Sequence, residues 1–261
     1  MELSIVKVGG GVVEEPASLN SLLDGFASLK GFKALVHGGG RSATKISERL
    51  GIKAQMVDGR RITDAETLKV VTMVYAGLVN KNIVAQLQRR GLNAIGFSGA
   101  DLDVIRSARR PIVHRPDGSD VDFGFVGDVK SVQTDVLADL IAKGAVPVMS
   151  PITHDGLGNL LNTNADTIAS ELARAMARHA QVRLVYCFEK PGVLLDANDD
   201  SSVIPVLDFA KFKEYQASGV VAAGMIPKLD NGFDALRQGV SSVVITSVEG
   251  LLSGTGTTLV L

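Results

Sequence analysis

Short apolar runs rich in β-branched residues alternate along this chain with longer stretches whose apolar residues recur every three or four positions. The short runs lie within residues 3–8, 33–40, 92–99, 143–152, 182–188 and 241–247. The longer stretches lie within residues 17–30, 41–50, 64–90, 164–180, 207–217 and 228–239. The short runs predict strands and the longer stretches predict helices, with a break near Gly77 in the helix over 64–90.

Helices that separate successive strands predict βαβ units. Such units build a mainly parallel sheet with helices on both faces, so the pattern predicts an α/β fold. Residues 110–129 predict a hairpin instead, with Pro116, Asp117 and Gly118 at its tip. No repeat or low-complexity tract divides the chain. If it forms two lobes, we expect the boundary near residue 175, where a helix could pass from one lobe to the other.

Composition is that of an ordinary globular enzyme. Of the 261 residues, 46% are hydrophobic and 21% are charged. The formal net charge of -1 lacks the basic excess of a dedicated nucleic-acid binder. A single cysteine, Cys187, excludes a disulfide framework and a cysteine-based zinc site. No apolar run approaches the ~20 residues that span a bilayer, and no signal-peptide pattern is evident, so we expect a cytoplasmic protein without membrane contact.

Two predicted strands end in glycine triplets, Gly9–Gly11 and Gly38–Gly40, and Lys7 lies just before the first. Glycine lets backbone N–H groups approach an anion, and a following helix N-terminus adds partial positive charge. A tight turn explains one triplet equally well, but both triplets together with Lys7 favour anion binding. A Walker A loop is excluded because its lysine follows the glycines, and a G-x-G-x-x-G fingerprint is missing.

Two further clusters carry polar groups at predicted helix starts. Asn162, Asn164 and Asp166 open one helix, where each alone could serve as a cap or a partner of the helix dipole. Gly224 and Lys228 stand at the start of another, where a cation opposes the dipole. Such a local misfit is expected at functional sites.

Lys7, Asp166 and Lys228 together suit phosphoryl transfer. This chemistry depends on positioning and on neutralising charge rather than on covalent help from the protein. Two lysines could neutralise the transferred group, an aspartate could hold both lysines, and the glycine loops could cradle the remaining oxygens.

At this point the chain resembles the amino-acid kinase superfamily, and within it the N-acetylglutamate (acylglutamate) kinase family. The resemblance rests on VKVGGG, VHGGG, DGRRIT, VDFGFVGDV, NTNADTIASELA, KPGVL and GMIPKLDNGFDAL, which occur in the family's order over essentially the whole chain. It implies a three-layer αβα sandwich around a mainly parallel sheet. It also implies a single domain over 1–261, with an acylglutamate-binding lobe at 1–175 and an ATP-binding lobe at 176–261.

The resemblance implies the reaction and the residue roles. ATP, with Mg²⁺ held mainly by its phosphates, would phosphorylate the γ-carboxylate of N-acetyl-L-glutamate or N-succinyl-L-glutamate in arginine biosynthesis, and no metal site made by the protein alone is expected. The implied catalytic residues are Lys7, Asp166 and Lys228; the substrate-binding residues are Gly39, Gly40, Arg61, Asn162 and Asn164; the nucleotide-binding residues are Gly9, Gly10, Glu189, Gly192, Gly224 and Met225.

Several positions depart from the family pattern. Leucine usually precedes Arg61, whereas this chain has Arg60, which could pair with the extra carboxylate of a succinyl group or could be a solvated surface residue. Residues 188–192 lack the usual Ser/Thr-Asp, and Ala223 replaces a glycine before Gly224. No extra helix precedes the first strand, which implies a homodimer without feedback by arginine.

Alternatives on the same fold are another kinase of the superfamily, such as glutamate 5-kinase, and a non-catalytic amino-acid sensor. The GRRIT and NTNAD segments favour the acylglutamate branch. Loss of a lysine or of the aspartate would favour the sensor, and all three residues are present.

Overall fold

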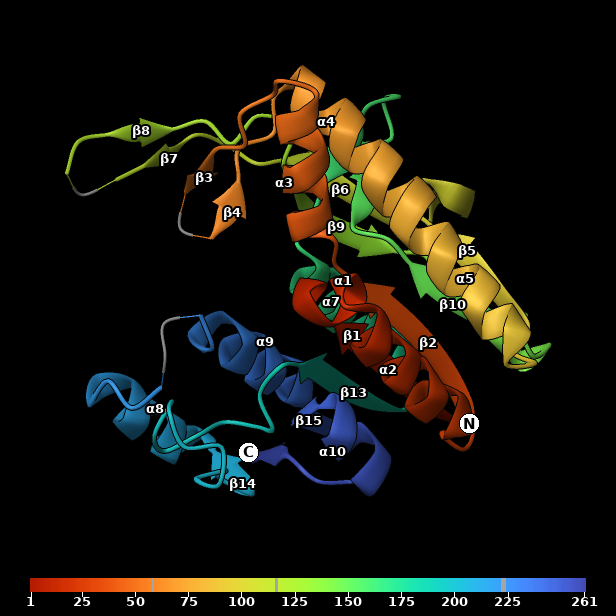
Figure 1. The fold of residues 1–261 in the computed structure, drawn as a ribbon, viewed down its shortest axis with the longest axis vertical. Coiled ribbons are helices and arrows are strands. Elements are labelled where there is room, and N and C mark those ends of the chain that lie inside the picture. The colour runs from red at the N-terminus through yellow and green to blue at the C-terminus, as the bar shows by residue number, and fades with distance from the viewer. Residues whose placement is uncertain (58, 116, 222–223) are drawn as a thin grey trace.

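The computed structural model describes residues 1–57, 59–115, 117–221 and 224–261, and its centre is an eight-stranded sheet (Figure 1). The strands, in sheet order, are β14 (Val206–Asp208), β16 (Thr257–Val260), β15 (Ser242–Ser247), β13 (Gln181–Phe188), β1 (Glu2–Val8), β2 (Phe32–His37), β10 (Val146–Met149) and β5 (Ala94–Phe97). Every neighbouring pair is parallel except β15 and β16. The predicted α/β class with a mainly parallel sheet is confirmed.

Helices cover both faces of this sheet. One face carries α6 (Thr134–Ala142), α7 (Ala165–Met176), α8 (Phe209–Ala217) and α9 (Ile226–Arg237). The other carries α1 (Gly10–Glu14), α2 (Pro16–Ser28), α3 (Gly40–Arg49), α4 (Ala65–Thr72), the π-helix η1 (Met73–Val79), α5 (Asn80–Arg89) and α10 (Val248–Ser253). The predicted three-layer sandwich is therefore also confirmed. The expected lobe boundary at residue 175 falls in the last turn of α7.

The apolar runs of the central strands reflect burial on both faces. In β1, Ile5 belongs to the core under α7 and α9, while Val6 belongs to the core under α2. Leu184 and Val185 divide in the same way in β13. Successive strand residues point to opposite faces, so a sheet covered on both sides needs continuous apolar sequence.

The helix over residues 65–89 is not broken near Gly77, contrary to the expectation. Residues 73–79 continue it with π-helical hydrogen bonding. The 25-residue helix is apolar and long enough to cross a membrane by length and composition alone. Its residues Val70, Val74 and Ile83 are buried against the sheet, and 44% of its most apolar window lies inside the protein. This packing accounts for its composition without a membrane.

A second, four-stranded sheet lies beside the central one and was not foreseen. It contains β12 (Leu160–Asn162), β11 (Ile152–His154), β6 (Ile105–Arg109) and β9 (Gly127–Val132), in that order. A 3₁₀ turn, η2 (Asp101–Asp103), precedes β6. Two hairpins project from this region, β3 (Met56–Val57) with β4 (Arg60–Arg61) and β7 (Val113–His114) with β8 (Asp120–Val121) (Figure 1).

The second of these hairpins confirms the one predicted within residues 110–129. Residues 127–132 extend beyond it and pair with β6 instead. Pro116, predicted at its tip, lies outside the described residues.

His37 ends β2 with a fully buried side chain. Its Nδ1 lies 2.7 Å from the carbonyl oxygen of Gly38, and its Nε2 lies 3.1 Å from Nδ2 of Asn80. Asn80 Nδ2 also donates to Val148 O at 2.8 Å. A carbonyl only accepts and an amide NH₂ only donates, so His37 is neutral with its proton on Nδ1. The ring thereby ties β2, α5 and β10 together beneath the second glycine triplet.

We predict that His37 makes the fold sensitive to acid. Burial lowers the pKa of His37 from 6.5 to about 4, and nearby Lys81 acts in the same direction. The unfolded chain therefore takes up this proton near pH 6.5 and the folded chain only near pH 4. The free energy of unfolding should fall by roughly 3 kcal/mol across that interval.

Urea unfolding at several pH values checks this. The His37→Gln variant should be less stable at pH 7 but should lose less stability than the wild type between pH 6.5 and 4. Parallel pH dependences of the two proteins would contradict the assignment.

Candidate active site

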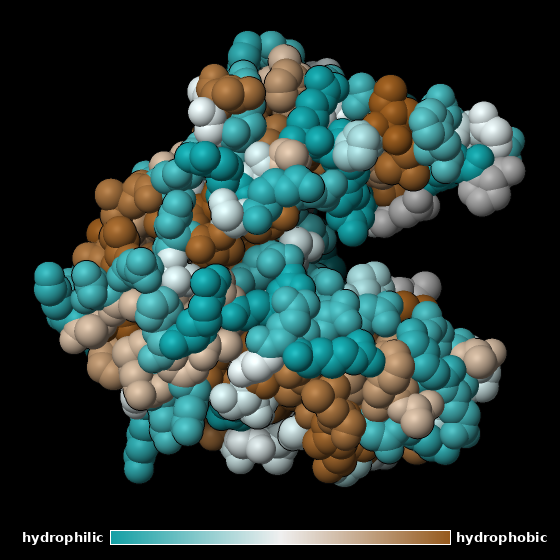
Figure 2. Space-filling view, turned by 180° about the vertical axis from the view of Figure 1, so that it is seen from behind, coloured by the Kyte–Doolittle hydropathy of each residue, from teal (hydrophilic) through white to brown (hydrophobic). Residues whose placement is uncertain are grey.

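A cavity of about 390 Å³ opens where the central strands end. Figure 2 shows the molecule hollowed between the part that bears the two hairpins and the part that bears α8 and α9. Part of the lining comes from the carboxyl ends of β1, β2 and β13, where ligands bind in parallel α/β sheets, and from the start of α7. The whole lining comprises Lys7, Gly9–Gly11, Gly38–Gly40, Arg41, Met56, Gly59, Arg60, Arg61, Tyr75, Val126, Pro151, Asn162–Asp166, Phe188, Glu189 and Lys228.

The two glycine triplets face each other across one side of this cavity. A Cβ on Gly38 would lie 3.4 Å from the amide nitrogen of Gly10, and a Cβ on Gly10 would lie 3.8 Å from the amides of Gly39 and Gly40. Helices α1 and α3 begin within these triplets. The N–H groups of a first helical turn have no acceptor within the helix, so they remain available to a ligand.

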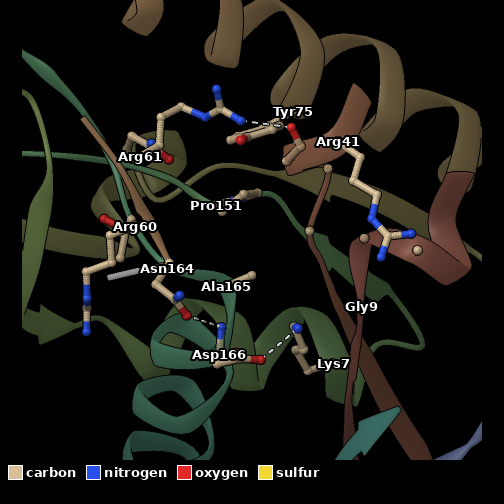
Figure 3. A pocket seen from close by; sticks show the side chains of 18 of the residues that line it. Lys7, Gly9, Arg41, Arg60, Arg61, Tyr75, Pro151, Asn164, Ala165 and Asp166 are labelled. Carbon is tan, nitrogen blue, oxygen red and sulfur yellow. Dashed lines mark hydrogen bonds and ion pairs between the residues drawn. The ribbon is translucent and has the colours of Figure 1, made fainter. Parts of the chain in front are cut away.

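Asp166 joins two lysines that come from distant parts of the chain. Its Oδ1 lies 2.7 Å from Nζ of Lys7, and its Oδ2 lies 3.4 Å from Nζ of Lys228. Lys7 is the next-to-last residue of β1, on the face covered by α7. Asp166 is in the first turn of α7, and Lys228 is in the first turn of α9. Figure 3 shows Lys7 and Asp166 pointing toward one another at the floor of the cavity.

The charges of this triad determine its protonation. Burial alone would raise the pKa of Asp166, but Lys7 and then Lys228 more than offset it and hold that pKa below the ordinary value. Asp166 is therefore ionised at neutral pH. One carboxylate faces two ammonium groups, so the cluster keeps a net positive charge that can attract an anion.

Arg61 is fixed at the opposite side of the cavity. Its Nη2 donates to Gly40 O at 2.9 Å and to Thr44 Oγ1 at 2.7 Å. Its buried Nη1 has no hydrogen-bond partner among the described residues. Buried donors are nearly always satisfied, so this nitrogen is available to an acceptor on a ligand.

Tyr75 completes this side and was not anticipated. Burial raises the pKa of its hydroxyl, and the adjacent guanidinium of Arg61 partly offsets this. A Cβ on Gly39 would lie 2.9 Å from the Tyr75 ring, so the close packing there requires glycine. Tyr75 stands in an apolar helical pattern, where nothing in the sequence separates a cavity residue from a core residue.

Arg60 points away from Arg61, as consecutive strand residues do (Figure 3). It is partly buried beside Arg110, which pairs with Asp128. Burial lowers the pKa of Arg60, Arg110 lowers it further, and Asp128 opposes both. Arg60 therefore lines the cavity on a different side from Arg61.

The two asparagines differ in their contacts. The side chain of Asn164 caps α7 by accepting from the N–H groups of Asp166 at 2.8 Å and Thr167 at 3.2 Å. Nδ2 of Asn162 donates to Thr63 Oγ1 at 3.0 Å. The capping role considered for Asn164 is therefore present, and both residues also line the cavity.

Not all of the predicted nucleotide residues share this cavity. Gly9, Gly10 and Glu189 line it, whereas Gly192 and Met225 line a smaller, mainly apolar hollow nearby with Lys190, Val193, Leu194, Ala197, Val220 and Val221. The carbonyl of Gly224 lies 3.3 Å from Nζ of Lys228. Ala223 and Asp58, cited in the family comparison of the sequence, lie outside the described residues.

No group of three or more His, Cys, Asp or Glu side chains that could hold a metal ion occurs in residues 1–57, 59–115, 117–221 and 224–261. Asp166 and Glu189 are the acidic residues among those that line the main cavity, and both are paired with basic side chains.

The amino-acid sequence of this chain is similar to those of a known protein family. Residues 2–247 match the profile described as the amino acid kinase family. The acetylglutamate kinases of Bacteroides fragilis and Bacteroides thetaiotaomicron are each 61% identical to this chain over 256 residues. These alignments cover 98% of this chain and 96% and 97% of the two relatives.

A solved structure shows the same architecture. The N-acetylglutamate synthase from Neisseria gonorrhoeae, complexed with coenzyme A and N-acetyl-glutamate, superimposes with a TM-score of 0.80 and 20% sequence identity. The match covers 99% of this chain and 59% of that chain. At this identity the likeness shows the fold alone.

Proposed function

Since the chain belongs to the amino acid kinase family, and within it to the acetylglutamate kinases, we propose that it transfers the γ-phosphoryl group of ATP to the γ-carboxylate of an N-acyl-L-glutamate. The ion-paired triad of Lys7, Asp166 and Lys228 in the cavity is the observation that carries this proposal. The names of the relatives support N-acetyl-L-glutamate as the substrate and arginine biosynthesis as the pathway.

The reaction forms one bond and breaks another. An oxygen of the γ-carboxylate attacks the γ-phosphorus, and the oxygen that bridges the β- and γ-phosphorus atoms leaves with ADP. The products are ADP and an acyl phosphate. Charge in the transition state is spread over the transferred group, where positioned cations stabilise it.

Lys7 and Lys228 would supply these cations. Asp166 is a positioning residue because it holds both ammonium groups and stays ionised. An aspartate that lost its charge would leave two partly buried lysines to repel each other. The lowered pKa of Asp166 supports this role at neutral pH.

The backbone of the first triplet would bind the phosphates of ATP. Gly9 and Gly10 face the cavity at the start of α1, and Glu189 faces it from the end of β13. The apolar hollow lined by Gly192 and Met225, together with Gly224 beside Lys228, is suited to the nucleoside. Mg²⁺ supplies further charge neutralisation to the phosphates when it is bound. The few carboxylates in the cavity support a metal held mainly by the nucleotide.

The other side of the cavity would bind the acylated amino acid. Nη1 of Arg61, which has no hydrogen-bond partner among the described residues, would donate to an oxygen of the α-carboxylate, and the charges of both groups strengthen such a bond. Gly39, Gly40, Asn162 and Asn164 line the space between Arg61 and the triad. On this proposal residues 1–175 form the acylglutamate-binding lobe and residues 176–261 the ATP-binding lobe.

The proposal extends to the compartment and the oligomeric state of the enzyme. We expect it to act on small molecules in the cytoplasm, as a homodimer. Exposed apolar side chains on the long helix, Met73 and Leu78, support self-association because pairing would remove them from water.

We predict that the enzyme releases ADP from MgATP in the presence of N-acetyl-L-glutamate or N-succinyl-L-glutamate but not of free L-glutamate. The acyl group removes the positive charge of the α-amino group, which would be repelled by the basic cavity. A coupled ADP assay with the three substrates in parallel measures this. Turnover with free glutamate alone would identify a glutamate 5-kinase, and nucleotide binding without turnover would favour a sensor.

We predict that Arg60 sets the preference between acyl groups. A succinyl group carries a carboxylate that Arg60 could pair with, whereas an acetyl group does not. Arg60→Leu should lower the ratio of kcat/KM for the succinyl over the acetyl substrate by about ten- to a hundredfold, as expected for the loss of a hydrogen bond to a charged group. The acetyl substrate serves as the internal control, and an unchanged ratio would show that Arg60 does not contact the acyl group.

A further inference from the structure

Arg41 and Glu189 meet across the mouth of the main cavity. Arg41 is the second residue of α3 and directly follows the second glycine triplet. Glu189 directly follows β13, on the side of the cavity proposed for the nucleotide. Arg41 Nη2 and Glu189 Oε1 are 3.5 Å apart. The pair therefore joins α3, on the side proposed for the acylglutamate, to the end of β13, on the side proposed for the nucleotide.

The tips of both side chains lie over the first glycine triplet. A Cβ on Gly11 would stand 1.6 Å from Glu189 Oε1 and 2.9 Å from Arg41 Nη1. Figure 3 shows Arg41 reaching from the start of α3 toward the segment that carries Gly9. The carboxylate thus occupies space next to the backbone of Gly11, at the edge of the cavity.

Stability does not account for this pair. Its side chains are 68% and 51% exposed, and ion pairs exposed to this degree contribute little to folding. A cation in the first turn of a helix also opposes the helix dipole. The charge of Arg41 therefore does not favour folding. A second anion bound beside the first glycine triplet would stabilise that charge.

We propose that Arg41 is a further phosphate-binding residue and that Glu189 occupies its guanidinium until ATP arrives. The polyphosphate carries more negative charge than one carboxylate, and an arginine fork matches phosphate oxygens well. ATP displaces Glu189 from Arg41, and the guanidinium then joins Lys7 and Lys228 in neutralising the phosphates. This inference rests on the proposed ATP-dependent function. It changes the role of Glu189 from a residue that binds the nucleotide to one that competes with ATP for Arg41.

The two residues should consequently act in opposite directions. Arg41→Gln removes a phosphate contact, so kcat/KM for ATP should fall by about ten- to a hundredfold. Glu189→Gln removes the competitor, so KM for ATP should fall by about two- to fivefold, as expected from the weakness of an exposed pair. In the Arg41→Gln background, Glu189→Gln should change KM for ATP little, because the guanidinium for which Glu189 and ATP compete is then missing.

Steady-state kinetics with varied MgATP test this with matched controls. Arg49→Gln removes the same charge from the last turn of α3, roughly 12 Å along the helix, and should leave KM for ATP unchanged. Arg41→Lys keeps the charge but not the fork and should recover part of the loss. Thermal unfolding of Arg41→Gln should occur at the wild-type temperature or above it, since the substitution relieves the clash with the helix dipole.

The outcomes separate this inference from the proposed function. A wild type without ATP-dependent turnover would refute the function itself. A wild type that turns over, with Arg41→Gln matching Arg49→Gln, would refute the role of Arg41 alone. An Arg41→Gln variant that raises KM for the acylglutamate rather than for ATP would refute it too. A Glu189→Gln variant that raises KM for ATP would refute the competition.

Discussion

The two-sided ion pair of Asp166 is the interaction on which the rest of the site depends. It joins the end of β1, the start of α7 and the start of α9, which lie in separate parts of the sequence. Lysines brought this close would repel each other without a carboxylate between them. Because α7 and α9 pack on the same face of the sheet, the fold delivers all three side chains to one point while leaving an excess of positive charge directed at the cavity.

The same site contains several features that do not favour folding. Lys228 and Arg41 both stand in first helical turns, where the dipole disfavours a cation. The glycine triplets give up side-chain packing, and a buried donor of Arg61 has no partner within the described part of the chain. Each of these features becomes favourable once an anion occupies the cavity. The arrangement is therefore more readily explained by the ligands than by the fold.

Many residues of the candidate site could be predicted from the sequence, because they depart from what their own strand or helix requires. A lysine within an apolar strand, glycine triplets after two strands and polar groups at helix starts each stand out against what a strand or helix requires. Tyr75 and Thr44 could not be found in this way, because their contacts with the site arise only when α3, the π-helix and β4 come together. Arg41 could not be found either, because its contact with Glu189 needs α3 and the end of β13 to meet. The antiparallel placement of β16 and the small second sheet also depend on long-range pairing. The π-helical turn at Gly77 depends on hydrogen bonding within the folded helix, which a periodicity argument cannot resolve.

The rate of acyl phosphate formation in variants of the two lysines tests the central claim most directly. Hydroxylamine converts the acyl phosphate to a hydroxamate, which can be measured with MgATP and N-acetyl-L-glutamate. If Lys7 and Lys228 act as one unit, Lys7→Met and Lys228→Met should each slow the reaction by ~10²–10³, and the double variant should be only slightly slower than either. A folded single variant that forms the hydroxamate at the wild-type rate would contradict the account.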